Sequence, residues 1–127
     1  MKRSLVLCLA LVGCGGGGDD PPPGDSGPIG DAPAATVMSV TCDGSEVETV
    51  ETTGGFRFSP NDITISVGQV VKFTNASNHS TVPGATPTDS GLRAGFGTST
   101  CLQFTAAGVF NYKCNPHSSM TGKVTVN

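Results

Sequence analysis

Residues 110–126 constrain the fold of this chain more than any other stretch. Phe110, Tyr112 and Cys114 alternate with polar residues. In a β-strand such alternating side chains lie on one face of the sheet, so the sulfur of Cys114 points into the core at the end of a strand. The polar residues that follow, and the apolar alternation that resumes after them, indicate a loop and a closing strand.

Cys114 is followed by His117 and then by Met120, each three residues further along. On a short loop this spacing lets a thiolate, an imidazole and a thioether converge on one point. Copper that cycles between Cu(I) and Cu(II) prefers two histidines and a cysteine in a trigonal plane, with a weak axial methionine. The second histidine has to be His79, because the chain contains only two. These four residues predict a site for one copper ion per chain.

Each ligand also has a plainer interpretation. Zinc competes with copper, since a cysteine and two histidines suit it as well. The methionine favours copper, because zinc has little use for a weak thioether donor. Taken singly, His79 could be an ordinary exposed loop residue and Met120 a core side chain that fills a gap.

The first 36 residues have a different composition from the rest of the chain. Lys2 and Arg3 precede a short apolar run, which predicts a secretory signal too short to span a bilayer. Residues 11–14, Leu-Val-Gly-Cys, resemble the bacterial lipobox, in which the cysteine is acylated; in the alternative, Cys14 is one more apolar residue after a cleaved signal. The predicted division is a signal peptide (1–13), a disordered tether rich in Gly, Pro and Asp (14–36) and a folded domain (37–127).

An acylated Cys14 predicts a protein of the cell envelope, held to a membrane by its lipid and located in the periplasm or at the cell surface. The glycine after this cysteine favours the outer membrane. The chain has no run of 18 apolar residues, so no transmembrane helix is predicted. The net charge is −3 and the basic residues are scattered, which argues against nucleic acid as a partner. We expect a monomer.

Beyond residue 37 the chain shows short alternating stretches with turns between them, and no helical period over more than two turns. Residues 63–67 and 71–73 predict a strand, a tight turn at Gly68 and a second strand. Residues 75–100 are polar and irregular, and such a long loop in a small domain is usually functional or mobile. About seven or eight strands in roughly 90 residues predict an all-β sandwich.

Two segments resemble the cupredoxins, a family whose small members include plastocyanin and amicyanin. They are residues 58–75, Phe-Ser-Pro-Asn-Asp-Ile-Thr-Ile-Ser-Val-Gly-Gln-Val-Val-Lys-Phe-Thr-Asn, and residues 112–126, Tyr-Lys-Cys-Asn-Pro-His-Ser-Ser-Met-Thr-Gly-Lys-Val-Thr-Val. The two residues between His117 and Met120 are more similar to the loop of amicyanin than to the longer loop of plastocyanin. The resemblance covers about residues 37–127 and implies a Greek-key β-sandwich with a type 1 (blue) copper centre. It also implies electron transfer between redox protein partners.

The resemblance assigns His79 as the first ligand and Cys114, His117 and Met120 as the others. Pro116 matches the family's Cys-x-Pro-His form and removes one backbone donor that could reach the sulfur.

Ser80 stands where the family often has Asn, and its hydroxyl could tie the two ligand loops together. The family likeness also implies that the edge of His117 reaches the surface through a patch of small and apolar residues. The candidates for this patch are Pro83, Gly84, Pro116 and Ser118. The chain departs from the family in having no Trp, and residues 81–100 align with no member.

The chain has five cysteines, and each can be given a role. Cys8 leaves with the signal, Cys14 carries the lipid and Cys114 binds the metal. Cys42 and Cys101 are left as an even pair in an oxidising compartment, either as a disulfide or as two free thiols.

The sequence shows no nucleophilic serine motif or paired carboxylates, and both histidines are assigned to the metal, so we do not expect an enzyme. Two other functions stay open. The domain could store or deliver copper at the cell surface, or it could be a cupredoxin-shaped interaction module.

Overall fold

A computed structural model describes residues 35–127; the predicted signal peptide, Cys14 and all but the last two residues of the predicted tether lie outside the described residues. Across residues 35–127 the chain forms nine strands and no helix. They are β1 (Val37–Val40), β2 (Glu48–Thr53), β3 (Arg57–Ser59), β4 (Asp62–Ile65), β5 (Val70–Thr74), β6 (Val82–Pro83), β7 (Ser99–Phe104), β8 (Gly108–Lys113) and β9 (Thr121–Val126). The described part of the chain therefore offers no helix of the length and hydropathy needed to cross a membrane.

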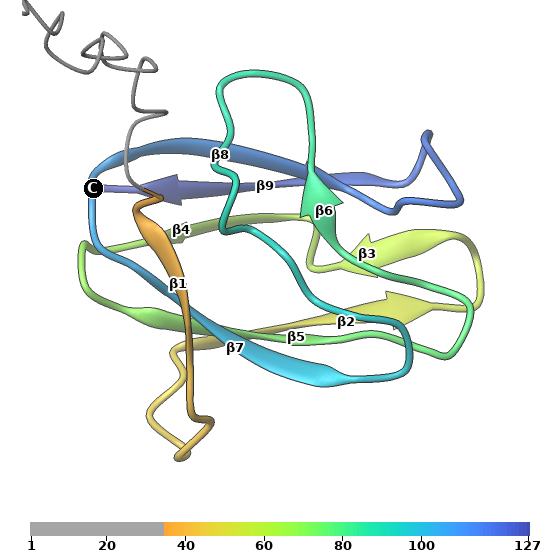
Figure 1. The fold of residues 1–127 in the computed structure, drawn as a ribbon, viewed down its shortest axis with the longest axis horizontal. Coiled ribbons are helices and arrows are strands. Elements are labelled where there is room, and N and C mark those ends of the chain that lie inside the picture. The colour runs from red at the N-terminus through yellow and green to blue at the C-terminus, as the bar shows by residue number, and fades with distance from the viewer. Residues whose placement is uncertain (1–34) are drawn as a thin grey trace, which may run out of the picture. The chain divides into compact units, whose positions relative to one another are not determined.

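The strands form two sheets that pack as the layers of a sandwich (Figure 1). One sheet has the order β1-β7-β5-β2-β3, and the other has the order β4-β9-β8-β6. Two pairs of neighbours, β2 with β5 and β4 with β9, run parallel, and the remaining pairs run antiparallel. The predicted all-β sandwich is confirmed. The structure has more strands than the predicted seven or eight, because the two-residue strand β6 lies within residues 75–100, which the sequence predicts to be an irregular loop.

The turn predicted at Gly68 is present, with a positive φ of 87° that suits glycine. Its two flanking strands do not pair with each other, however: β4 belongs to one sheet and β5 to the other. The turn is fixed to a third strand, because the N–H of Gly68 donates to the carbonyl of Phe104 at 2.6 Å. Alternation in the sequence shows which side chains of a strand are buried, but it does not say which strand lies beside it.

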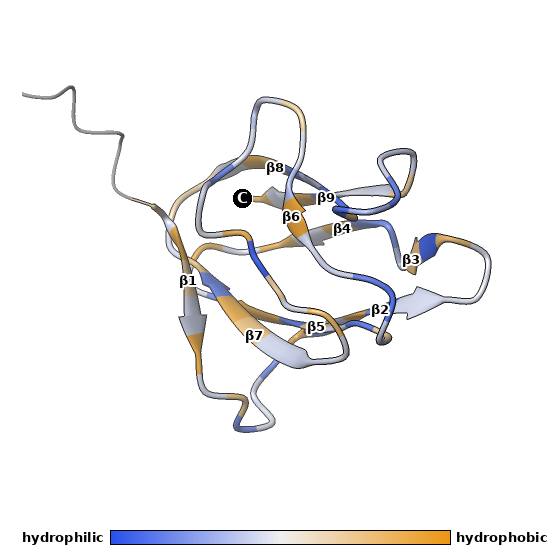
Figure 2. Ribbon diagram, turned by 45° about the vertical axis from the view of Figure 1, so that its right-hand side comes forward, coloured by the Kyte–Doolittle hydropathy of each residue, from blue (hydrophilic) through white to orange (hydrophobic). Residues whose placement is uncertain are grey.

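The core lies between the two sheets, and in Figure 2 hydrophobic segments alternate with polar ones along the strands. Tyr112 on β8 is at its centre, with its ring edge-on to those of Phe58 and Phe73 at centroid distances of 4.9 and 5.3 Å. Each such aromatic pair contributes about 0.5–1.5 kcal/mol beyond its buried area. The ring fits because Gly122 lies opposite, where a Cβ would stand 2.2 Å from the tyrosine ring. Burial raises the pKa of the Tyr112 hydroxyl, and the nearby carboxylate of Asp62 raises it further.

The edge strand β1 pairs with β7, and two further contacts attach it. A disulfide joins Cys42, just beyond β1, to Cys101 on β7. At the other end of the strand, the N–H and hydroxyl of Thr36 donate to the carboxylate of Asp89 at 2.7 and 3.0 Å. The predicted tether therefore makes contacts with the folded domain at its last residue, Thr36.

Candidate metal centre

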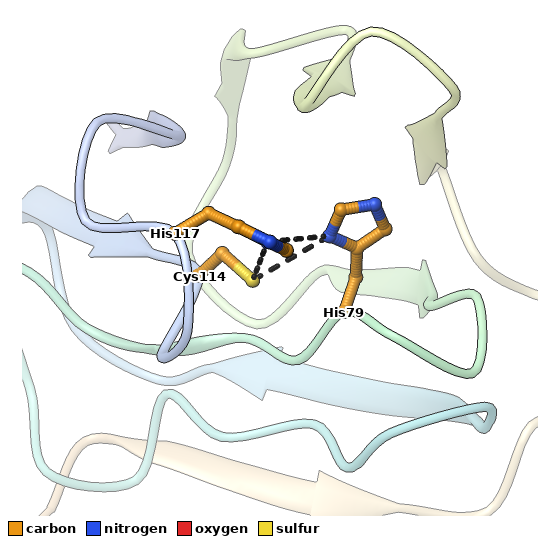
Figure 3. Close-up of side chains that lie close together, drawn as sticks. All are labelled: His79, Cys114 and His117. Atoms are coloured by element: carbon orange, nitrogen blue, oxygen red, sulfur yellow. Dashed lines mark hydrogen bonds between the residues drawn. The ribbon is translucent and has the colours of Figure 1, made fainter.

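Three of the predicted ligands converge from two loops. His79 lies on the loop that follows β5, Cys114 directly follows β8, and His117 lies on the loop between β8 and β9. Figure 3 shows their side chains pointing toward one another. The cysteine is fully buried and His79 is 3% exposed, whereas His117 is half-buried.

The spacing of the three donor atoms fits a single metal ion. Cys114 Sγ lies 3.6 Å from His79 Nδ1 and 3.7 Å from His117 Nδ1, and the two Nδ1 atoms are 3.2 Å apart. With metal–nitrogen bonds of about 2.0 Å and metal–sulfur bonds of about 2.3 Å, donors around one ion lie roughly 3.3–3.8 Å apart, and all three distances match this range to within about 0.1 Å. One thiolate and two imidazoles at these distances are therefore a preformed donor set.

Met120 closes the loop that carries two of the ligands. The N–H of Cys114 donates to the carbonyl of Met120 at 2.9 Å, and the N–H of Met120 donates to the carbonyl of His117 at 2.8 Å. Its side chain is only 1% exposed. The methionine is therefore a buried residue of the same short loop, as an axial thioether would have to be.

Ser80 connects the two ligand loops. Its N–H donates to Cys114 Sγ at 3.5 Å, and its hydroxyl accepts a hydrogen bond of 3.4 Å from the N–H of Asn115. An N–H aimed at the sulfur can donate to a thiolate, the form in which cysteine binds metal. Pro116 follows Asn115 and has no N–H, so it adds no second backbone donor at this point.

Asn75 holds the first ligand loop in place, and the sequence analysis did not identify it. Its amide is buried and donates to the carbonyls of Ala94 and Gly95 at 3.2 and 3.0 Å, and to the hydroxyl of Thr81 at 3.3 Å. The only signal for it in the sequence is an Asn that directly follows an alternating stretch and precedes His79 by four residues. These bonds connect the loop of His79 to residues 94–95, in the segment that the sequence analysis could not align.

The surface around His117 differs in part from the predicted patch. Pro116 and Ser118 are exposed, whereas Pro83 and Gly84 are only half-exposed. The structure adds Phe56, from the turn between β2 and β3, whose ring centroid lies 4.6 Å from that of His117.

A second cluster of possible ligands does not form a metal site. Glu46 Oε1 lies 3.1 Å from the sulfur of Cys101, and Cys42 lies beside them. The two sulfurs are bonded to each other, so neither carries a proton to donate nor a thiolate to bind metal.

The known proteins that this chain resembles are copper proteins. The family model described as copper binding proteins, plastocyanin/azurin family, matches residues 45–127. Among solved structures, a reduced tryptophan-to-tyrosine mutant of amicyanin is similar with a TM-score of 0.59 and 20% identity, covering 72% of this chain and 99% of that chain. The reduced Cu(I) form at pH 4 of a proline-to-glycine mutant of amicyanin gives a TM-score of 0.58 and 22% identity, over 72% and 99% of the two chains. The structural likeness shows a shared fold. Residues 45–127, which the family model matches, include all four predicted ligands.

Proposed function

Because the chain belongs to the plastocyanin/azurin family of copper-binding proteins, we propose that it is an electron carrier that exchanges single electrons between redox protein partners. In this proposal His79, Cys114, His117 and Met120 hold one copper ion. The observation that supports it most directly is the convergence of the three donor atoms within 3.2–3.7 Å of one another.

Bound copper would supply a reversible one-electron couple, and a weak thioether donor from Met120 would favour Cu(I) relative to a stronger donor. The residues of the chain supply rigidity. Cys114 is held by the backbone hydrogen bond to Met120 and by the N–H of Ser80, and both strands that flank its loop belong to one sheet. Ligands that are already in place move little when the charge at the site changes, and small movement favours fast electron transfer.

The difference in exposure between the two histidines indicates where electrons would pass between the copper site and a partner protein. His79 is buried, whereas His117 is half-buried and its neighbours Pro116 and Ser118 are exposed. Electrons would therefore enter and leave at the edge of His117, where a partner protein can approach.

A copper titration followed by visible spectroscopy tests this function. A thiolate bound to Cu(II) gives strong charge transfer, so the oxidised protein should be intensely coloured with one copper per chain, and reduction should bleach it reversibly. Cys114→Ser should abolish the colour. Met120→Leu should keep the colour and raise the reduction potential, because only the weak axial donor is lost. A wild-type protein that binds zinc but stays colourless with stoichiometric Cu(II) would contradict the proposal.

We further propose that the protein is a lipoprotein of the cell envelope, tethered through Cys14. The support is the sequence alone: a lipobox-like Leu-Val-Gly-Cys is followed by a segment rich in Gly, Pro and Asp. A flexible tether of that length would reach about 26 Å and would leave the domain free to meet partners near the membrane. Cys14→Ser should release the protein from the membrane fraction or leave its signal uncleaved. Unchanged partitioning of this variant into detergent would exclude the anchor.

A further inference from the structure

The turn between β2 and β3 contains an unusual residue. Thr53 pairs with Arg57, so the loop between the strands has three residues, 54–56. Three-residue hairpin loops commonly end in a residue with left-handed backbone conformation, a position that favours glycine. Here that position holds Phe56, with φ at 53°, although glycines occupy the two positions before it.

A bulky side chain in this conformation costs free energy, and such strain is commonly kept where a side chain has a function. Phe56 is also 54% exposed, which makes it one of the most exposed large apolar side chains among residues 35–127. Neither the backbone conformation nor the burial of this residue accounts for a phenylalanine here.

The contacts of its ring do account for it. The Phe56 ring lies edge-on to both histidine ligands, with centroid distances of 4.6 Å to His117 and 5.8 Å to His79. The other aromatic contact that the His117 ring makes within residues 35–127 is with His79, itself a proposed ligand. Phe56 is therefore the one aromatic neighbour in this region that can support the His117 ring from outside the donor set.

Phe96 provides a comparison within the same chain. It is 50% exposed and also lies in a loop, but its ring makes no aromatic contact among the described residues. The left-handed position beside it is taken by a glycine, Gly97, with φ at 60°. Exposed phenylalanine alone is thus not what distinguishes the β2–β3 turn.

We propose that Phe56 is a positioning residue for the copper centre: its ring holds the imidazole of His117 in the ligating orientation and covers its outer side against water. This inference rests on the proposed copper site but concerns a residue outside the ligand set. An apolar cover limits the access of water to the metal, and water stabilises the more highly charged Cu(II). Phe56 would therefore slow the release of copper and raise the reduction potential.

Phe56→Gly is the sharpest variant, because it removes the ring and at the same time relieves the backbone conformation, so loss of folding is not expected. Phe56→Tyr keeps the ring, and Phe96→Ala is the matched control for removing an exposed phenylalanine. The purified full-length protein is used throughout.

The first measurement needs no copper. In NMR spectra of the metal-free protein, the ring protons of His117 should show contacts to the Phe56 ring and a ring-current shift. Both should disappear in Phe56→Gly, persist in Phe56→Tyr and be unchanged in Phe96→Ala.

The second measurement uses the copper-loaded protein. Phe56→Gly should release Cu(I) to a colorimetric chelator about 2- to 10-fold faster, the factor that corresponds to the loss of one aromatic pair. Its reduction potential should fall, while Phe56→Tyr and Phe96→Ala should behave as the wild type.

Unchanged His117 signals in metal-free Phe56→Gly would overturn the proposal, and so would an unchanged potential and release rate. A wild-type protein that gives no coloured copper complex would instead reject the electron-transfer function. The metal-free spectra would still decide whether Phe56 orders His117.

Discussion

The loops at the metal centre and the edge strand β1 are held by different kinds of contact. The loop of His79 is bound to residues 94–95 by the hydrogen bonds of Asn75, and to the loop of Cys114 by those of Ser80. Strand β1 is held by a disulfide and by the carboxylate of Asp89. The first set fixes where the ligand atoms lie, and the second fixes a strand that contributes no ligand. We therefore expect changes at the metal loops to alter copper binding, and changes at β1 to alter stability alone.

The largest effect on stability should come from the disulfide. Cys42 and Cys101 are 59 residues apart in sequence. Closing a loop of that length stabilises the folded state by about 4 kcal/mol in the chain-entropy model. Replacing both cysteines by alanine should therefore lower the free energy of unfolding by about 4 kcal/mol, as measured by urea denaturation of the metal-free protein.

If changes at β1 alter stability alone, the copper spectrum of this double variant should match that of the wild type. A changed charge-transfer band would show that β1 and the metal loops are coupled. Thiol titration of the denatured, unreduced protein gives an independent check, since residues 35–127 should contribute one free thiol, that of Cys114.

Asn75→Ala should have the next largest effect, and it should affect both stability and copper binding. The substitution leaves the buried hydroxyl of Thr81 without its amide partner and releases the loop of His79 from residues 94–95. A buried polar group that loses its partner costs about 1–3 kcal/mol, so the free energy of unfolding should fall by about 2 kcal/mol.

Copper affinity should fall in the same variant, because one imidazole is no longer held near the sulfur. Competition with a chelator measures this affinity. Ser99→Ala is the control. The Ser99 hydroxyl, on β7, makes an exposed hydrogen bond with that of Thr74, on β5 just before Asn75, so its removal should change stability by less than about 0.5 kcal/mol. If Asn75→Ala lowered stability but left copper affinity unchanged, the first loop would not need its hydrogen bonds to present His79.

The smallest effect should come from Asp89, and it should depend on pH. Burial alone raises the pKa of Asp89, but the hydrogen bonds from Thr36 and Gly91 outweigh it, and the net pKa lies below the ordinary value. A lowered folded-state pKa means that the carboxylate stabilises the fold above its unfolded pKa of about 3.9. This contribution is lost as the pH falls through the folded pKa.

Asp89→Asn should therefore lower the free energy of unfolding by about 1 kcal/mol at pH 7, the size of a typical hydrogen bond. The difference from the wild type should stay constant down to about pH 5 and shrink below about pH 4. Thermal unfolding measured across this range tests both points. Glu48→Gln is the control, because this carboxylate lies exposed on β2 and makes no hydrogen bond or ion pair among residues 35–127. A pH-independent difference for Asp89→Asn would show that the carboxylate charge does not contribute.

Much of this molecule follows from local patterns in the sequence. Alternation placed Phe110, Tyr112 and Cys114 on the buried face of β8, and all three are buried. The spacing of Cys114, His117 and Met120 predicted that all three share one short loop, and they lie between the end of β8 and the start of β9. Such features depend on residues that are close in sequence, where the pleat of a strand or the length of a loop decides the outcome.

Contacts between distant segments decided the rest. The alternation of residues 63–73 could not show that β4 and β5 belong to different sheets, because the pattern of buried side chains is the same for either partner. The hydrogen bonds of Asn75 to residues 94–95 and the contact of Phe56 with His117 each join segments far apart in the chain. The sequence by itself determined the buried faces and the loop from Cys114 to Met120, because both are local, and it indicated His79 only because the chain has no other histidine besides His117. Only the tertiary structure decided which surroundings support each ligand, because those depend on which loops the two sheets bring together.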